Sequence, residues 1–158
     1  METLILLIVL ILLSGLFSGS EIALVSLSQA KVKALVDKKA KNSQSIAKLK
    51  DNPNRMIITI LIGNNLVNIS ASVVATIWTT ETFGNEYLGY ATGLLTLLIL
   101  VFGEIFPKVV AQKYSIFFAQ LVSNILILIQ YLFYPLILIL EYFLLKITNS
   151  MKIKEDNL

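Results

Sequence analysis

Two residue types that hold most transition metals in proteins are missing from this sequence. Its 158 residues include no cysteine and no histidine. Without cysteine the chain has no disulfide and no thiolate metal site, and without histidine it lacks the commonest zinc ligand and the commonest general base. A metal bound here must be held by oxygen, which favours Mg²⁺, Ca²⁺, Mn²⁺ or Na⁺ over zinc or copper.

Charge is scarce as well. Only 15% of the residues are charged, 56% are hydrophobic, and the mean hydropathy is +0.80. That is too apolar for a soluble domain of this length. Eight of the thirteen basic residues fall between Lys31 and Arg55, in a loop between two apolar stretches. This position indicates a loop at the cytoplasmic membrane surface rather than a nucleic-acid partner.

Three apolar stretches are long enough to cross a hydrocarbon core of ~30 Å. We predict an all-α integral membrane protein with three transmembrane helices at about residues 3–27, 55–78 and 88–106, within a transmembrane ion-transport domain over 1–150. A cleaved signal peptide is the alternative for the first stretch, but the chain starts Met1-Glu2 without a basic residue and the apolar run is long. The Lys-rich loop is predicted to form short amphipathic juxtamembrane helices.

The charges flanking these stretches predict the orientation. Because basic loops stay inside, the Lys-rich loop is cytoplasmic and the N-terminus lies outside a cell (plasma) membrane. The link that carries Glu81 and Glu86 is then outside, and Lys108 and Lys113 are inside. The C-terminus is expected in the cytoplasm.

Residues 114–148 fit no simple pattern. This segment is too long for one straight span and too short for two spans with a turn. Pro135 divides it, and the lysines that follow favour the same side as Lys113. We predict re-entrant or belt helices that return to the cytoplasmic side, with a fourth full span as the alternative. Residues 151–158 are polar and are expected to begin a linker.

The first apolar stretch contains a row of serines and glycines. Ser14 and Ser18 are four residues apart and share a helix face, with Glu21 close to that face. Gly15 and Gly19 have the same spacing, which is typical of close helix packing. Serines in such helices also bond back to a carbonyl one turn earlier, so Ser20 and its neighbours have a structural as well as a functional interpretation.

The second stretch is interrupted by Gly63, Asn64 and Asn65, and Asn68 continues the polar stripe. Adjacent asparagines form helices poorly and are costly against lipid. They have two interpretations, hydrogen bonds between helices or a locally unwound turn with exposed carbonyls, as in broken ion-binding helices.

The third stretch carries a single charge, Glu104, between Tyr87 and Pro107. An ionisable residue inside a span is expensive and indicates a functional site. Pro107 has no N–H for the carbonyl of Gly103, so an acceptor is left free beside Glu104. A salt bridge near the inner face is the alternative. Hydroxyls, amides, carbonyls and one carboxylate together form the hard oxygen shell that Mg²⁺ prefers.

These three motifs in this order resemble the transmembrane domain of the CorC / cyclin-M family of magnesium transporters. The resemblance is carried by Leu13–Glu21 (LSGLFSGSE), Ile62–Ile69 (IGNNLVNI) and Gly103–Lys108 (GEIFPK). It implies a homodimer of three-span subunits with a belt of juxtamembrane helices, and Mg²⁺ export driven by inward Na⁺. The metal-binding positions that it implies are Ser14, Ser18, Gly63, Asn64 and Glu104, with a possible ion pathway over Ser20, Glu21, Asn65 and Asn68. Members usually continue into cytoplasmic nucleotide-binding regulatory domains, which this chain lacks, so it is expected to be a piece of a longer protein.

A second interpretation makes the chain a membrane anchor and dimerisation module for a cytoplasmic sensor, with no transport of its own. Its polar residues then only join helices, a role that rarely needs a carboxylate such as Glu104. An enzyme is not expected, because the sequence offers no convincing pair of nucleophile and base.

Overall fold

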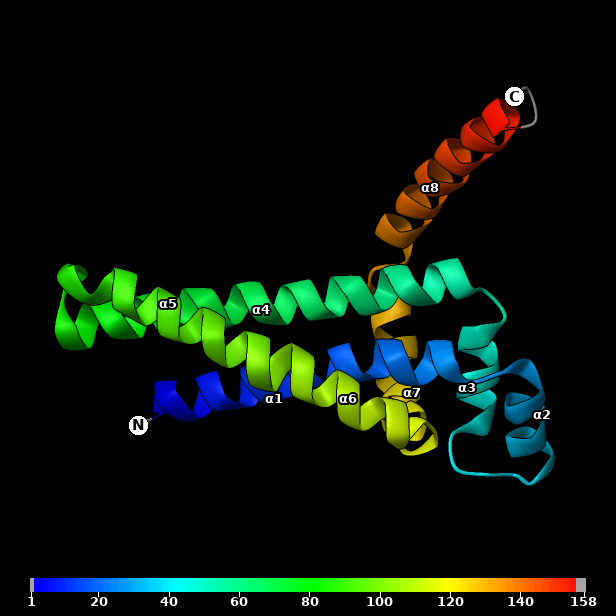
Figure 1. The fold of residues 1–158 in the computed structure, drawn as a ribbon, viewed down its shortest axis with the longest axis horizontal. Coiled ribbons are helices and arrows are strands. Elements are labelled where there is room, and N and C mark those ends of the chain that lie inside the picture. Colours follow the sequence, from blue (N-terminus) through cyan, green and yellow to red (C-terminus); the bar gives the residue numbers. More distant parts are fainter. Residues whose placement is uncertain (1, 156–158) are drawn as a thin grey trace.

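The computed structural model describes residues 2–155, and the side chains of residues 2–149. The described chain is almost entirely helical, without a strand, and the prediction of an all-α membrane protein is confirmed. Three long helical segments lie side by side along the molecule (Figure 1). They are α1 (Glu2–Ser26), α4 (Pro53–Phe83), and a continuous helical path of η1 (Asn85–Tyr87), α5 (Leu88–Leu98), η2 (Ile99–Ile105) and α6 (Phe106–Lys113).

The second and third segments are longer than the sequence suggested. The second was expected to end at Trp78, but α4 continues to Phe83 and stops at Gly84, whose φ of 93° favours glycine. Trp78 and Phe83 pack edge to face in this last turn, with ring centroids 5.5 Å apart. The third was expected to end near Phe106. It continues to Lys113 because a widened turn before Pro107 accommodates the missing N–H.

One end of the bundle carries a group of shorter helices. The Lys-rich loop forms α2 (Gln29–Asp37) and α3 (Ser43–Lys50), as the sequence predicts. Here the core residues Leu24, Ile46, Met56 and Leu126 of four different helices are fully buried. Lys50 Nζ donates to the carbonyl of Leu24 at 2.8 Å, near the C-terminal end of α1. Burial lowers the pKa of Lys50.

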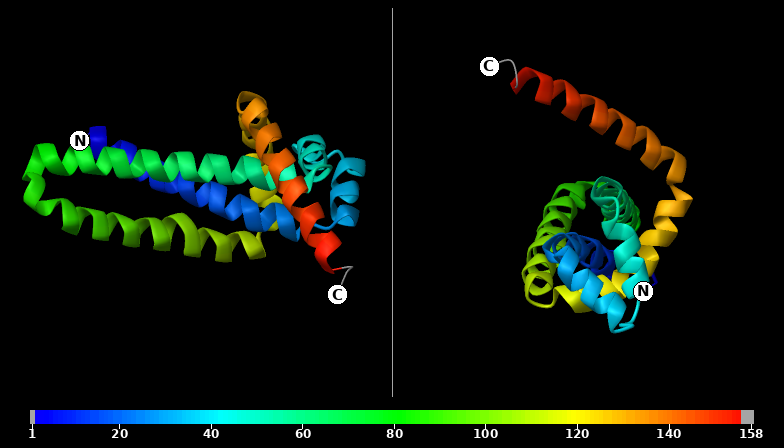
Figure 2. Two further views of the ribbon diagram at one scale, coloured as in Figure 1. Left: turned by 90° about the horizontal axis from the view of Figure 1, so that it is seen from above. Right: turned by 90° about the vertical axis from the view of Figure 1, so that its right-hand side faces the viewer.

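The segment 114–148 forms two helices, α7 (Ser115–Leu132) and α8 (Tyr134–Glu155). Within the described part of the chain, four helical segments are long and apolar enough to cross a membrane, and α7 is one of them. However, α7 runs across the end of the bundle and contacts α1, α3 and α4, whereas the other three lie along its axis (Figures 1 and 2). This arrangement is what belt helices require. The number of spans stays a prediction.

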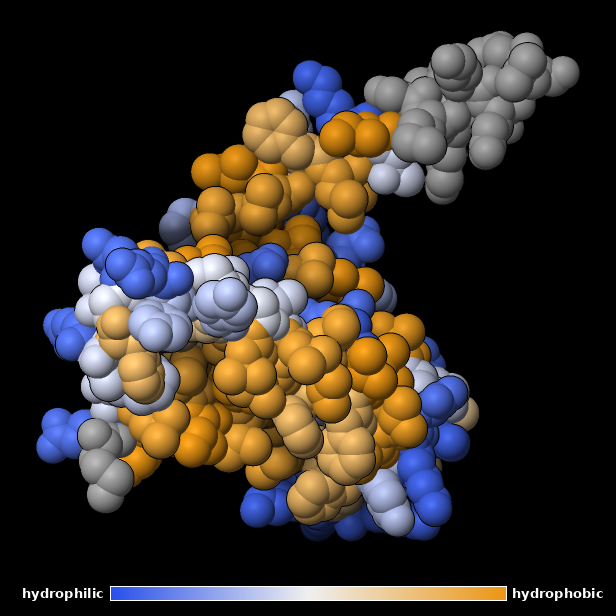
Figure 3. Space-filling model, turned by 60° about the vertical axis from the view of Figure 1, so that its left-hand side comes forward, coloured by the Kyte–Doolittle hydropathy of each residue, from blue (hydrophilic) through white to orange (hydrophobic). Residues whose placement is uncertain are grey.

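Helix α8 projects away from the bundle (Figure 2). Its clearest polar attachment is Glu141, which accepts hydrogen bonds from Asn52 at 2.7 Å and from Arg55 at 2.8 and 3.0 Å. The linker expected at 151–158 starts within this helix, and residues 156–158 lie outside the described part. Large apolar side chains such as Leu12, Ile69 and Leu94 are exposed along the bundle. Figure 3 shows this apolar face, with hydrophilic residues gathered at its edges. It is the surface expected against lipid.

Candidate cation site

All three sequence motifs meet at the side chain of Ser14. Ser14 is buried on α1, and its Oγ lies 3.4 Å from Asn64 Oδ1 on α4 and 3.5 Å from the carbonyl oxygen of Gly103 in η2. A hydroxyl has a single proton, so the two acceptors compete for it, and both distances are at the long limit for a hydrogen bond. Three oxygens from three helices are therefore gathered but only loosely bonded to one another.

Close helix approach makes this meeting possible. A Cβ on Gly103 would lie 2.8 Å from Ser14 Oγ, and a Cβ on Gly15 would lie 2.8 Å from Cγ of Pro107. Gly19 likewise leaves room for the ring of Phe118 on α7. The close packing predicted for Gly15 and Gly19 therefore joins α1 to α6 and α7 of the same chain.

The Gly103 carbonyl is available because the backbone widens at η2, a π-helical stretch. The N–H of Phe106 bonds to the carbonyl of Val101, five residues earlier, and Pro107 has no N–H to offer Gly103. Turns of this kind are rare inside α-helices and occur often at functional sites. Pro107 cannot make the bond that the sequence analysis considered, and the hydroxyl of Ser14 faces the Gly103 carbonyl.

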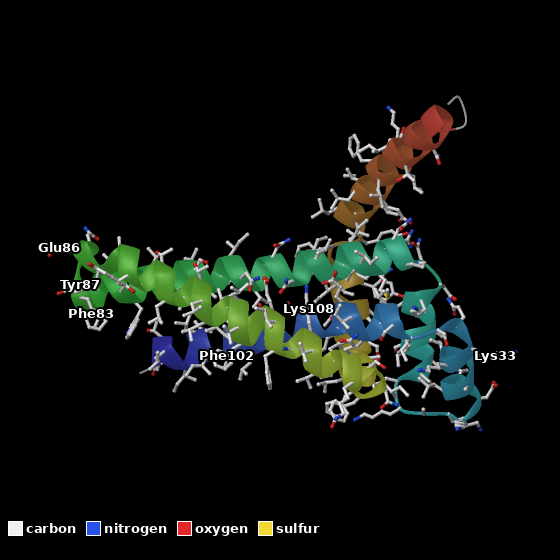
Figure 4. All side chains as sticks on the ribbon, viewed as in Figure 1. Lys33, Phe83, Glu86, Tyr87, Phe102 and Lys108 are labelled. Carbon is white, nitrogen blue, oxygen red and sulfur yellow. The ribbon has the colours of Figure 1, made fainter. Side chains whose placement is uncertain are left out.

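Glu104 follows Gly103 and is half-buried. Among the described residues it has neither an ion pair nor a hydrogen bond, so the salt bridge considered from the sequence is absent there. Lys108, one turn further along, instead pairs with Glu21 on α1 at 3.3 Å. Figure 4 labels Lys108 beside α1. The single carboxylate of the third span is thus uncommitted.

Two further polar atoms of the motifs are buried without a partner among the described residues, Ser18 Oγ and Asn68 Oδ1. Because α1 and α4 are antiparallel, Ser18 and Asn68 lie on opposite sides of the Ser14–Asn64 level, each about one turn or ~5 Å away along the axis. An unpaired buried polar atom is costly, and each one calls for water or an ion as its partner. The two atoms extend the candidate site along the bundle.

The other predicted residues are placed differently. Ser20 donates to the carbonyl of Phe17 at 2.6 Å, which is the structural interpretation of these serines, and Glu21 is held by Lys108. Asn65 is exposed and lines a groove between α4 and α8 rather than the Ser14 cluster. The structure therefore does not bring Ser20, Glu21 and Asn65 to the cluster.

Gly63 has a packing role. Helix α4 runs unbroken through residues 63–68, so the unwound turn considered for this motif is not present. Asn64 makes the hydrogen bond between helices that was the other interpretation. A Cβ on Gly63 would lie 2.6 Å from the ring of Phe17, so the glycine leaves room for this ring. The irregular backbone lies in the third segment, where proline enforces it, and not in the second.

The sequence analysis did not single out a further set of hydroxyls. These hydroxyls lie beyond the Ser14 cluster, on the side away from Lys108. They line a cavity of about 100 Å³ between α4 and α5, which includes Ser72, Thr76, Thr92 and Thr96. Ser72, Thr76 and Thr96 donate to the carbonyl one turn earlier, so only their oxygen lone pairs are left for the cavity. The signal in the sequence is the spacing of four between these residues on each helix.

The charge of the site is low. Within residues 2–149, no three acidic side chains come together as a metal-binding group. A cation here would be held by one carboxylate and several neutral oxygens. Such a shell suits Mg²⁺ or Na⁺ and offers little to zinc.

Comparison with known proteins gives a consistent picture. The family described as the cyclin M transmembrane N-terminal domain matches residues 5–158. A UPF0053 protein of Haemophilus influenzae is 39% identical over 152 residues, 96% of this chain and 36% of that protein. The UPF0053 inner membrane protein YfjD of Escherichia coli is 35% identical, over 91% of this chain and 34% of its own length. The metal transporter cnnm-4 of Caenorhabditis elegans is 26% identical over 68% of this chain and 24% of its own length. The chain thus spans about a third of the length of the first two relatives.

Proposed function

Because this chain belongs to the family of cyclin M transmembrane N-terminal domains, a multi-pass membrane family that includes a metal transporter, we propose that it carries Mg²⁺ across the membrane. The proposed direction is export, coupled to Na⁺ moving inward. The ion binds in dehydrated form between the three long helical segments. The chain performs no catalysis in this proposal.

The observation that carries the proposal is the oxygen cluster at Ser14. Ser14 Oγ, Asn64 Oδ1 and the Gly103 carbonyl come from three helices, and the uncommitted carboxylate of Glu104 is next in sequence to Gly103. A membrane anchor needs helix contacts but has no use for a half-buried carboxylate without a partner inside a span. For this reason we favour transport over the anchor.

The low charge of the cluster suits transport. Mg²⁺ takes six oxygens at about 2.1 Å, and one carboxylate leaves the bound complex with a net positive charge. Binding of that kind is moderate, so the ion can leave again. The long hydrogen bonds of Ser14 cost little to break, because they lie at the limit of useful length.

The proposal extends to the assembly. We place the N-terminus outside and the C-terminus in the cytoplasm of the cell membrane, with two copies forming a homodimer. We also propose that the full-length protein carries cytoplasmic nucleotide-binding regulatory domains; the greater length of the first two relatives, of which this chain covers about a third, is compatible with this.

Calorimetric titration with Mg²⁺ tests the site directly. We expect wild type to bind and Glu104→Gln to lose measurable binding, since the variant removes the only negative charge of the cluster. Glu86→Gln is the matched control, because Glu86 lies on the turn at the other end of the bundle from α2 and α3 (Figure 4). Wild-type affinity in Glu104→Gln would refute the site. Loss of binding in both variants would point to a general charge effect.

Reconstituted vesicles then test direction and coupling. With Mg²⁺ on the cytoplasmic side, we expect its movement to the other side to require a Na⁺ gradient and to stop in Glu104→Gln. Intact binding without any Mg²⁺ movement would favour the anchor interpretation.

A further inference from the structure

A cavity lies apart from the Ser14 cluster, at the end of the bundle that carries α3 and α7. It measures about 300 Å³ and lies where α3, the start of α4, and the α7–α8 junction meet. It is lined by Lys48, Arg55, Ile127, Gln130, Tyr131 and Tyr134. Its lining thus combines two cations, two phenol rings and an amide, and contains no acidic side chain.

The two cations are held in place by aromatic contacts. Lys48 Nζ donates a hydrogen bond to the hydroxyl of Tyr131 and lies 4.8 Å from the centre of the Tyr131 ring. The Arg55 guanidinium lies 5.6 Å from the centre of the Tyr134 ring. Such contacts orient a cation without neutralising its charge. The positive charges therefore lie against the aromatic rings of the cavity wall.

The charge of this wall is only partly neutralised. Within residues 2–149, Lys48 has no acidic partner. Arg55 pairs with Glu141 through Nε and Nη2, a pairing that does not use Nη1. The 31-residue helix α4 also begins here, at Pro53, and the N-terminal end of a helix carries a partial positive charge. An anion in the cavity would meet these three positive groups.

The surroundings of the cavity are those of a membrane interface. Leu128 and Leu132 of α7 and Leu136 of α8 are exposed next to the lining residues in sequence. Tyrosines with an apolar ring and a polar tip gather at the level of lipid headgroups. Basic pockets between helices on the cytoplasmic side are suited to anionic headgroups. Apolar chains could then lie along the leucines while the headgroup enters the cavity.

We propose that this cavity binds the phosphate of an anionic membrane lipid. Lys48 and Arg55 contact the phosphate oxygens, Tyr131 and Gln130 add hydrogen bonds, and the acyl chains follow the exposed leucines. The bound lipid would tie α3, α4 and the α7–α8 junction together. This proposal does not depend on which ion the protein transports. A soluble phosphate compound such as a nucleotide has the same anionic chemistry, so the experiment must separate the two sources.

The test is a thermal unfolding series on the purified chain in neutral detergent. Phosphatidylglycerol is titrated against phosphatidylcholine, and inorganic phosphate and ATP serve as soluble arms at the same ionic strength. We expect phosphatidylglycerol alone to raise the Tm of wild type, by roughly 3 °C. Lys48→Gln should lose most of that shift. Lys33→Gln is the control, because it changes the net charge by the same amount. Lys33 lies on α2 and does not line the cavity (Figure 4).

Each outcome decides the proposal. An equal shift from phosphatidylcholine, or an equal phosphatidylglycerol shift in Lys48→Gln and wild type, overturns it. An equal shift from phosphate or ATP overturns the lipid and assigns the cavity to a soluble phosphate. If Lys48→Gln fails to fold, Tyr131→Phe replaces it, since it removes one hydroxyl and keeps the ring. Native mass spectrometry should then find an anionic lipid retained by wild type and by Lys33→Gln but depleted in the cavity variant.

Discussion

At the scale of single residues, the serines of the first helix divide into two kinds. Ser14 faces Asn64 and Gly103 with long hydrogen bonds, and Ser18 Oγ has no partner among the described residues. Ser20, two residues further, is satisfied within its own helix at 2.6 Å. Equal residue types thus differ in their contacts because helical geometry points them in different directions.

This difference predicts the effect of removing each hydroxyl. We expect Ser14→Ala and Ser18→Ala to weaken Mg²⁺ binding about tenfold each, the loss of one ligand worth ~1.4 kcal/mol. Ser20→Ala is the matched control and should stay within about twofold of wild type, a change of ~0.4 kcal/mol. Calorimetry on the three variants measures this. If Ser20→Ala is the most damaging change, the assignment of the binding face is incorrect.

At the scale of elements, the clearest polar contact between α8 and the bundle is the one that Glu141 makes. Glu141 on α8 is 12% exposed, and Arg55 and Asn52 at the start of α4 hold it. Burial alone would raise the pKa of Glu141, but hydrogen bonds from Asn52 and Arg55, together with the charge of Arg55, outweigh it and lower the pKa. The carboxylate form therefore stabilises the docked position of α8.

The lowered pKa predicts an acid-sensitive attachment. A group whose pKa is lower in the folded state contributes stability above its unfolded pKa, and this is lost as pH falls through the folded pKa. We expect wild type to lose about 1 kcal/mol more than Glu141→Gln on acidification from neutral pH, roughly 2–4 °C in Tm. Thermal unfolding of both proteins across this pH range measures the difference. Parallel pH curves would show that Glu141 does not hold α8.

At the scale of the whole molecule, the direction of α7 matters most. Its length and composition would allow a fourth span, but it lies across the bundle end and packs on α1, α3 and α4 (Figure 2). With three spans both the Lys-rich loop and the end of α8 face the cytoplasm. With four spans they lie on opposite sides.

Single cysteines decide between these topologies, since the chain has none of its own. A cysteine at position 39 in the α2–α3 loop and one at position 149 on α8 should react only from the cytoplasmic side. A cysteine at position 85, in the turn after α4, should react only from outside. Labelling with a membrane-impermeant reagent in intact cells and in inverted vesicles makes the comparison. External labelling at position 149 would establish a fourth span.

Assembly gives the last prediction. We expect a homodimer. Because all the clustered oxygens come from one chain, each subunit should contain its own cation site. Na⁺ should compete with Mg²⁺ for this hard oxygen shell, and zinc should gain little. Cross-linking in lipid tests the dimer, and Mg²⁺ titration at rising Na⁺ and constant ionic strength tests the competition. Only monomers in the first experiment would refute the dimer, and unchanged affinity in the second would argue against exchange.

The sequence by itself determined the membrane class and the three long helical segments, and it limited the ligands of the proposed cation site to oxygen atoms. Apolar run length is read directly against bilayer thickness, and the absence of histidine and cysteine leaves only oxygen ligands. It also indicated that Pro107 cannot bond to the Gly103 carbonyl, because a proline has no backbone N–H to donate.

Only the tertiary structure decided which polar residues meet. Ser14 and Ser20 are equivalent as residue types, and so are Asn64 and Asn65. Only Ser14 and Asn64 face each other between the helices. The path of α7 across the bundle and the cavity at Lys48 and Arg55 depend on contacts between segments about 80 residues apart. No local pattern encodes such contacts, because packing between helices sets them.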